Sequence, residues 1–291
     1  MSNDHNLSRC SVLVEFNVSA WTARKLDRKV TTEVTTSKSA SADAARVNKH
    51  LFAGVQKLEA IHKHVAGKRN EFYLLTLPWS DSGLRLLPMT MFMKFKEWSS
   101  KSEQEFDQLV SDFLQAYPTL VSAQAFKLGT MFDRNEFPHV DELARRFRFR
   151  CTMMPMPEAG DFRIDAENDI AKELQEEYAK VYQDRVEGAM GDLWKSLHDT
   201  LSHIAERLTP DGDKGKIFRD SLVTGALEMC ERLTDLNVTK DPLLEKARKD
   251  LEGALLGVTP KELRENNAIR TDVKSQVNDI LSRMGSFTEI K

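Results

Sequence analysis

The feature that most constrains the fold is a stretch of 44 residues, 165–208, that contains no proline. Its apolar residues recur at intervals of three and four, at Met190, Leu193, Leu197, Leu201, Ile204 and Leu208. Apolar residues at this spacing line one face of an α-helix, and a helix of that length would span about 60 Å. The stretch therefore predicts one long amphipathic helix, in which Gly188 and Gly191 indicate a kink or a close contact with another helix.

Shorter helices are expected to complete the C-terminal half. Asp241 and Thr259 are each followed by proline, which is favoured at the first position of a helix, so both are predicted to be capping residues. Glu262 stands three residues after Thr259 and completes the pattern of a capping box. We therefore expect an all-helical arm or bundle.

The first half of the chain predicts strands as well as helices. Residues 11–21 alternate between apolar and mostly polar side chains, which is the pattern of a β-strand. Two apolar runs, residues 71–79 and 84–92, flank the turn-forming residues 80–83 and indicate a hairpin or an ordered loop. A helix break is expected at Tyr117-Pro118. Helical spacing is found at residues 22–34, 41–65, 92–116, 119–131 and 138–147.

An arginine-rich segment follows these helices. Phe147, Phe149 and Cys151 alternate with Arg148 and Arg150, which is the pattern of a strand with arginines on its solvent face. Prolines at positions 155 and 157 exclude the centre of a sheet, because proline cannot donate a ladder hydrogen bond. The segment is thus predicted to be an edge strand or a connection, and residues 161–164 a short returning strand.

Together these patterns predict an α+β fold. The chain has 291 residues, of which 41% are apolar, so it is long enough to bury a sizeable core. We expect a small mixed domain with short strands at residues 1–164, with a basic N-terminal region. A mainly α-helical domain, residues 165–291, would follow it and begin with the long helix.

Charge is distributed unevenly along the chain. The net charge is -3, but residues 1–100 hold 15 Lys or Arg against 9 Asp or Glu, so residues 101–291 carry a net charge of -9. The basic side chains are densest in residues 21–69, which contain 11 Lys or Arg and 4 Asp or Glu. This polarity fits a nucleic acid or another acidic partner at one end, and it equally fits head-to-tail association of copies.

No standard motif of enzyme chemistry is complete in the sequence. Residues 211–222 resemble a calcium-binding loop, but Leu222 replaces the bidentate glutamate; the segment also fails as a P-loop, because Pro210 occupies the first glycine position. Neither GxGxxG nor GxSxG occurs. The cysteines, Cys10, Cys151 and Cys230, lack any CxxC spacing and suit a reducing compartment. We predict a non-enzymatic protein without a cofactor.

One helical face combines potential metal ligands. Asp199, His203 and Glu206 share a face of the predicted long helix at positions i, i+4 and i+7. Charged helix faces are usually solvated, so we interpret this set as a surface stripe and predict no metal site. No segment has the apolar length that a bilayer crossing needs, which predicts no membrane association and a soluble protein of the cytoplasm, or of the host cytoplasm if a phage encodes the chain.

Basic and aromatic side chains supply a candidate nucleic-acid site. In single-strand recognition, lysine and arginine contact phosphates while exposed aromatic rings stack on bases. An alternative explanation is that the aromatic residues belong to the core and the cations only maintain solubility. The candidate residues are Trp21, Arg24, Lys25, Arg28, Lys29, Lys68, Arg69, Tyr73, Arg146, Arg148 and Arg150.

The order of motifs resembles a family of phage and plasmid proteins catalogued as a domain of unknown function. The similarity rests on the opening strand followed by AWTARKLD, on LPWSDSGLRLLP, on a helix bearing Phe106 and Phe113, and on MPMPEAGDFRID, and it covers about the first 200 residues. The resemblance brings no catalytic residues. The resemblance implies that the gene for this chain lies near replication and recombination genes, or near the genes of AAA+ ATPases with von Willebrand-type partners.

Two hypotheses follow. In the first, the chain is an oligomeric phage-type accessory protein that binds single-stranded nucleic acid through its basic N-terminal half and associates with itself or a partner through its acidic helical half. In the second, it is a structural or adaptor protein without nucleic-acid affinity, whose helical arm packs against copies of itself or an AAA+ ATPase. Salt-sensitive binding to nucleic acid distinguishes the two.

Overall fold

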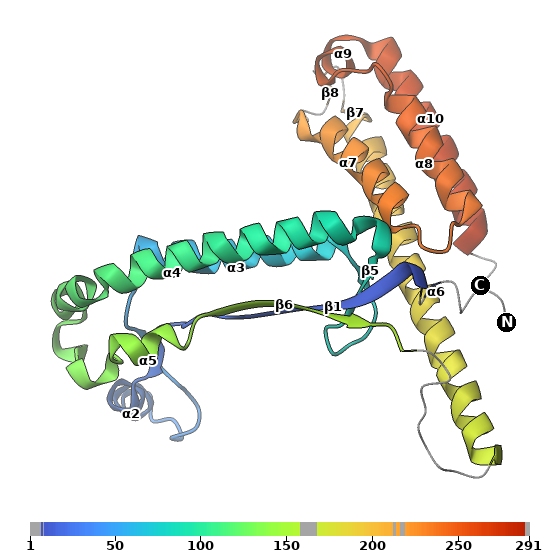
Figure 1. Cartoon of the computed structure of the whole chain (residues 1–291). Coiled ribbons are helices and arrows are strands. Elements are labelled where there is room, and N and C mark those ends of the chain that lie inside the picture. The colour runs from blue at the N-terminus through green and yellow to red at the C-terminus, as the bar shows by residue number, and fades with distance from the viewer. Residues whose placement is uncertain (1–6, 8, 158–167, 212–213, 216–218, 289–291) are drawn as a thin grey trace. The chain divides into compact units, whose positions relative to one another are not determined.

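The computed structural model describes residues 7, 9–157, 168–211, 214–215 and 219–288 (Figure 1). It confirms the predicted α+β class, because a small antiparallel sheet built from the first half of the chain is followed by helices. Within the described part of the chain, none of the helices carries the long apolar stretch that a bilayer crossing requires.

The chain forms two compact units built from discontinuous segments. Unit 1 comprises residues 1–15, 72–95 and 153–291, and unit 2 comprises residues 16–71 and 96–152. Two strands and two long helices each continue from one unit into the other. The predicted division between residues 164 and 165 concerns independent folding domains, which these units do not test, and it stays a prediction.

The main sheet has four strands in the order β4 (Leu77–Pro78), β5 (Arg85–Pro88), β1 (Ser11–Ser19) and β6 (Arg148–Pro155). The predicted hairpin is confirmed, because Leu77 pairs with Leu86 in antiparallel register across residues 80–83. The predicted arginine strand is confirmed as β6, which lies at an edge of the sheet and ends at its proline. The predicted strand at residues 161–164 lies outside the described residues.

A second sheet occupies residues that we expected to be helical. β2 (Arg24–Leu26) pairs with β3 (Asn48–His50), and only then does α3 (Gln56–Leu75) begin. The predicted helices at residues 22–34 and 41–65 are therefore wrong in their first parts, although α2 (Arg28–Ser37) and α3 occupy the rest. The reason lies at Lys49, which is buried and held by charged partners distant in sequence.

Helix α4 (Phe92–Leu128) also departs from prediction, because it continues through Pro118 without a break. Proline removes one hydrogen bond of the helix. The helix tolerates this loss because Phe113, Tyr117 and Val121 are buried on one face on both sides of the proline and hold it against the core. Short 3-10 turns, Gly129–Met131 and Arg134–Glu136, lead to the predicted short helix α5 (Val140–Ala144).

The core of unit 2 is aromatic. Helices α3 and α4 lie side by side along β1 and β6 (Figure 1), and Phe16 of β1 meets Phe149 of β6 edge to face at 5.2 Å between ring centroids. Phe106 of α4 packs on the same Phe149 at 5.6 Å, and Phe52 contacts Phe113 at 5.9 Å. Edge-to-face packing of this kind stabilises a core beyond the burial of apolar area alone.

The core of unit 1 is formed by the sheet and by helices. The long helix is confirmed as α6 (Asn168–Arg207), and its predicted apolar face is buried, with Leu197 and Leu201 fully enclosed. Among the residues that the structure describes, a Cβ at Gly188 or Gly191 would meet nothing within 4 Å, so the close-contact alternative is wrong there, and the kink alternative stays a prediction. The remaining elements are β7 (Pro210–Asp211), β8 (Lys214–Gly215), α7 (Ser221–Leu236), α8 (Pro242–Leu255), α9 (Pro260–Glu265) and α10 (Asn267–Thr288).

The two predicted helix caps are confirmed. The Asp241 carboxylate accepts a hydrogen bond from the backbone N–H of Leu243 at 2.8 Å, at the start of α8. Thr259 and Glu262 form a reciprocal capping box at the start of α9. These contacts satisfy backbone donors that lack a partner in the first turn of a helix.

Candidate nucleic-acid interface

Charge separates between the two units. By sequence, unit 2 holds 19 Lys or Arg against 14 Asp or Glu, a net charge of +5. Because the whole chain has a net charge of -3, unit 1 has a net charge of -8. The positive unit contains all the candidate residues except Tyr73. An excess of positive charge attracts a polyanion over a distance of about 10 Å at moderate salt. The search for a nucleic-acid site therefore concentrates on unit 2.

Several cations of unit 2 are already neutralised. The ammonium of Lys49 lies 2.5 Å from Glu136 and 3.6 Å from Asp27, with only 6% of its side chain exposed. Lys68 bridges Glu71 and Glu105 at 3.1 and 3.4 Å. Burial alone would lower the pKa of Lys68, but these two carboxylates raise it above its ordinary value. Lys68 is therefore a structural cation rather than an available one.

Two further candidate arginines have partners as well. The guanidinium of Arg69 lies 5.1 Å above the ring of Phe16, a cation–π contact. Arg146 forms an ion pair with Glu142, four residues earlier, and both side chains are substantially exposed. Exposed pairs of this kind contribute little to stability, so Arg146 can exchange its partner for a phosphate at small cost.

The candidate aromatic residues are not available as stacking platforms. Trp21 is only 8% exposed, and its ring packs 5.5 Å from Phe52 and 6.3 Å from Tyr117 in the core of unit 2. Tyr73 is 44% exposed, but it belongs to unit 1 and lies under the guanidinium of Arg85 at 4.8 Å. The alternative explanation, that these rings belong to the packing, describes Trp21 correctly.

The cations at the β2–α2 junction, in contrast, face solvent, although Lys25 also lies 4.0 Å from Glu136 with 51% of its side chain exposed. Arg24 and Lys25 lie on β2, Arg28 and Lys29 begin α2, and all four are exposed. The turn between them is fixed by Asp27, whose carboxylate caps α2 by accepting a hydrogen bond from the N–H of Val30 at 3.1 Å. That hydrogen bond lowers the pKa of Asp27. Sequence spacing places four positive side chains together, and the cap holds them there.

Two residues that the sequence prediction missed complete this surface. Phe126, near the end of α4, is 92% exposed, and Lys127 follows it. The ammonium of Lys127 lies 3.9 Å from the point that a Cβ on Gly54 would occupy, next to β3. The buried positions Tyr117, Val121 and Gln124 recur at intervals of four and three, so Phe126 falls outside the buried stripe. That spacing was a usable signal for its exposure.

We call the exposed cations of the β2–α2 junction, together with Phe126 and Lys127, the hairpin surface. The name refers to the antiparallel β2–β3 pair and not to the β4–β5 hairpin. A hydrogen bond of 2.9 Å from the Lys49 ammonium to the carbonyl of Met131 ties β3 to the turn that follows α4, so the end of α4 stays beside the β2–β3 pair. The hairpin surface is defined by Arg24, Lys25, Arg28, Lys29, Phe126 and Lys127.

Arg148 and Arg150 form a second basic surface on β6. Both are exposed, whereas Phe149 between them is buried, as the alternating pattern predicts. On the neighbouring strand β1, Asn17 and Ser19 are exposed. The hydroxyl of Ser19 donates a hydrogen bond to the carbonyl of Arg146 at 3.1 Å. Arg24, Lys25, Arg28 and Lys29 thus lie on the hairpin surface, and Arg148 and Arg150 lie on the β6 surface. The other predicted site residues lie on neither surface: Trp21, Lys68, Arg69, Tyr73 and Arg146.

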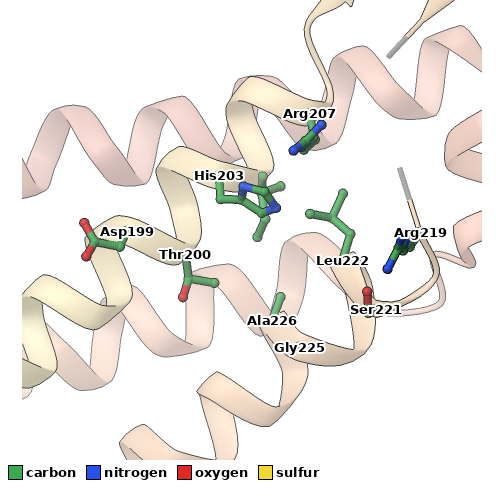
Figure 2. A pocket seen from close by; sticks show the side chains of 10 residues that line it. Asp199, Thr200, His203, Arg207, Arg219, Ser221, Leu222, Gly225 and Ala226 are labelled. Atoms are coloured by element: carbon green, nitrogen blue, oxygen red, sulfur yellow. The ribbon is translucent and has the colours of Figure 1, made fainter. Parts of the chain in front are cut away.

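The potential metal ligands of α6 line a pocket in unit 1. Figure 2 shows this pocket, of about 780 Å³, between α6 and α7. Asp199 and His203 both line it, but the Asp199 carboxylate points away from the imidazole ring (Figure 2) and lies 3.8 Å from His198 instead. In the part of the chain that the structure describes, no three His, Cys, Asp or Glu side chains converge as metal ligands.

Comparisons with models of protein families, with curated proteins and with solved structures each found no match.

Proposed function

We propose that unit 2 binds single-stranded nucleic acid through the hairpin surface, as a non-enzymatic accessory protein of the phage type. The observation that carries the proposal is the position of Phe126. Its aromatic ring is 92% exposed on the positive unit, and it is followed in sequence by Lys127, whose ammonium approaches Gly54 next to β3. An exposed phenylalanine ring lacks the stabilisation that burial of apolar surface gives, and a base stacked on the ring would provide it.

The physical roles follow from the side chains. Arginine and lysine of the hairpin surface contact phosphates, and Phe126 stacks on a base. Stacking on Phe126 needs an unpaired base, which favours a single strand over a duplex. Contacts from four or five cations would give a slope of log K against log salt of about -3 for a single strand.

The acidic unit 1 has a different role in the proposal. Its net charge of -8 opposes binding to a polyanion and leaves it available for protein contacts. We assign to it self-association into a homo-oligomer or contact with a partner such as an AAA+ ATPase. Both roles place the protein in the cytoplasm, or in the host cytoplasm if a phage encodes it.

The test is fluorescence anisotropy of an internally labelled single-stranded oligonucleotide at low and moderate salt, with a duplex as the control ligand. Arg24→Gln/Lys25→Gln removes two cations of the hairpin surface. Lys96→Gln/Lys101→Gln removes two exposed lysines of unit 2 on another part of α4 and serves as the matched control. We expect the first double variant to lose about tenfold or more in affinity and the second to lose much less.

Arg148→Gln/Arg150→Gln measures the contribution of the β6 surface in the same assay. A chain that binds neither DNA nor RNA single strands at low salt would refute the proposal. An equal loss in the hairpin and control variants would show attraction to net charge alone and would remove the hairpin surface from the site.

A further inference from the structure

A pocket opens beside the hairpin surface, within unit 2. It has a volume of about 480 Å³ and is lined by β2, β3, the turn that precedes α3, and α3 itself. The basic side chains that line it are Arg24, His50 and His62, each from a different element. Lys127 adds a further basic side chain at Gly54, on the wall of the pocket.

Arg24 and His50 are placed together by strand register. They are direct partners in the antiparallel β2–β3 pair, and side chains so paired lie on one face of a sheet about 5 Å apart. Both side chains are exposed, and neither forms an ion pair with any residue in the described ranges. This distinguishes them from Lys49 and Lys68, whose charges are matched by carboxylates.

The position of His62 is fixed by the backbone. Its Nε2 lies 2.9 Å from the carbonyl oxygen of Trp21. A carbonyl can only accept a hydrogen bond, so Nε2 carries the proton and Nδ1 is the ring nitrogen left for another partner. Ala23, two residues after Trp21, has φ +52°, and its carbonyl accepts a hydrogen bond from the N–H of Leu51 at 2.8 Å. Non-glycine residues held in this region often occur at ligand sites.

The remaining lining residues make the pocket roomy and mostly apolar. Ala20, Ala23 and Ala53 have small side chains, and Phe52 and Leu58 supply larger apolar surface from the core. The carboxylate of Glu59 lines the same pocket and can accept hydrogen bonds but not donate them. The pocket thus combines an anion-binding side, an apolar surface and one acceptor, which matches the phosphate, the ring faces and the N–H or O–H groups of a nucleotide.

We propose that this pocket binds the phosphorylated end of the single strand, with the terminal phosphomonoester against Arg24 and His50. The inference rests on the proposed function and adds to it which part of the strand enters the pocket, namely its phosphorylated end. A terminal phosphomonoester carries a charge of about -1.5 to -2, whereas an internal phosphodiester carries only -1. Side chains from β2, β3 and α3 surround the pocket, so a chain end enters it more readily than a strand that must pass in and out.

The experiment compares one internally labelled oligonucleotide with a 5′-phosphate, with a 3′-phosphate and with hydroxyls at both ends. The full-length chain should bind one phosphorylated form about tenfold more tightly than the hydroxyl form. His50→Gln, which alters only the pocket, should abolish that preference and leave the affinity for the hydroxyl form nearly unchanged. Lys25→Gln is the matched control: Lys25 is not among the pocket-lining residues, so its loss should weaken all three forms equally.

Failure of this inference is distinguishable from failure of the proposed function. Salt-dependent binding with no preference among the three forms would overturn the pocket assignment and leave the proposed function standing. If no strand binds, the proposed function fails, and adenosine monophosphate against adenosine, titrated by calorimetry, decides the pocket. Binding of the monophosphate alone, lost in His50→Gln, would support a phosphate pocket; no binding would overturn it.

Discussion

Replacement of Phe126 by alanine separates a binding role from a structural one. The side chain is 92% exposed, so truncation removes almost no buried area. We expect the free energy of unfolding to change by less than about 0.5 kcal/mol. If a base stacks on the ring, its loss costs about 1–3 kcal/mol of binding free energy, which corresponds to an increase in Kd of about 5- to 150-fold.

Anisotropy titrations with a single strand measure the binding change, and urea unfolding measures stability. Phe126→Trp provides the rescue, because a larger aromatic ring stacks at least as well. Phe113→Ala provides the opposite control: this ring is fully buried, and its loss should cost about 3–5 kcal/mol of stability. Unchanged affinity in Phe126→Ala, with binding intact in the parent chain, would refute the stacking role.

Three further predictions concern the stability and reactivity of the fold. Lys49→Met leaves Asp27 without its buried cation and Glu136 with only the half-exposed Lys25, 4.0 Å away, and should cost about 3–5 kcal/mol in urea unfolding; a loss below 1 kcal/mol would contradict this. Burial alone would raise the pKa of Glu71, but hydrogen bonds from Trp98 and Lys68 lower it below its ordinary 4.5. The ionised Glu71 therefore contributes stability above pH 4.5, and this contribution is lost as the pH falls through the lowered pKa. Trp98→Phe should weaken that pH dependence of the urea midpoint. Burial raises the pKa of Cys230 to about 11, so iodoacetamide at neutral pH should modify it only in denaturant; rapid labelling of the native chain would argue against burial.

Patterns that depend on local spacing were predictable from the sequence. The apolar stripe of α6, the capped starts of α8 and α9, and the alternation of β6 all depend on neighbours within a few residues. The structure confirms each of them. The exposure of Arg148 and Arg150 follows from the same alternation. Local spacing also grouped Arg24, Lys25, Arg28 and Lys29, because they are neighbours in the chain.

Contacts between distant segments were not predictable in this way. Lys49 of β3 can be buried because Glu136, nearly ninety positions later, neutralises its charge. Arg69 looked like an available cation because its partner Phe16 is remote in sequence. Lys68 has one local partner, Glu71, but its second partner, Glu105, is remote. A composition count cannot separate paired from unpaired charges, and only the fold does so.

The departures from prediction within unit 2 lie close together. The strands β2 and β3 stand where helices were expected, and α4 continues past Pro118 toward Phe126. These segments meet at the hairpin surface, where Lys49 bonds to the turn after α4 and Lys127 approaches Gly54. Natural sequences conflict with their local preferences most often where function requires it. Here the two departures bring the β2–β3 pair and the end of α4 together, with exposed cations on β2 and the exposed Phe126 on α4.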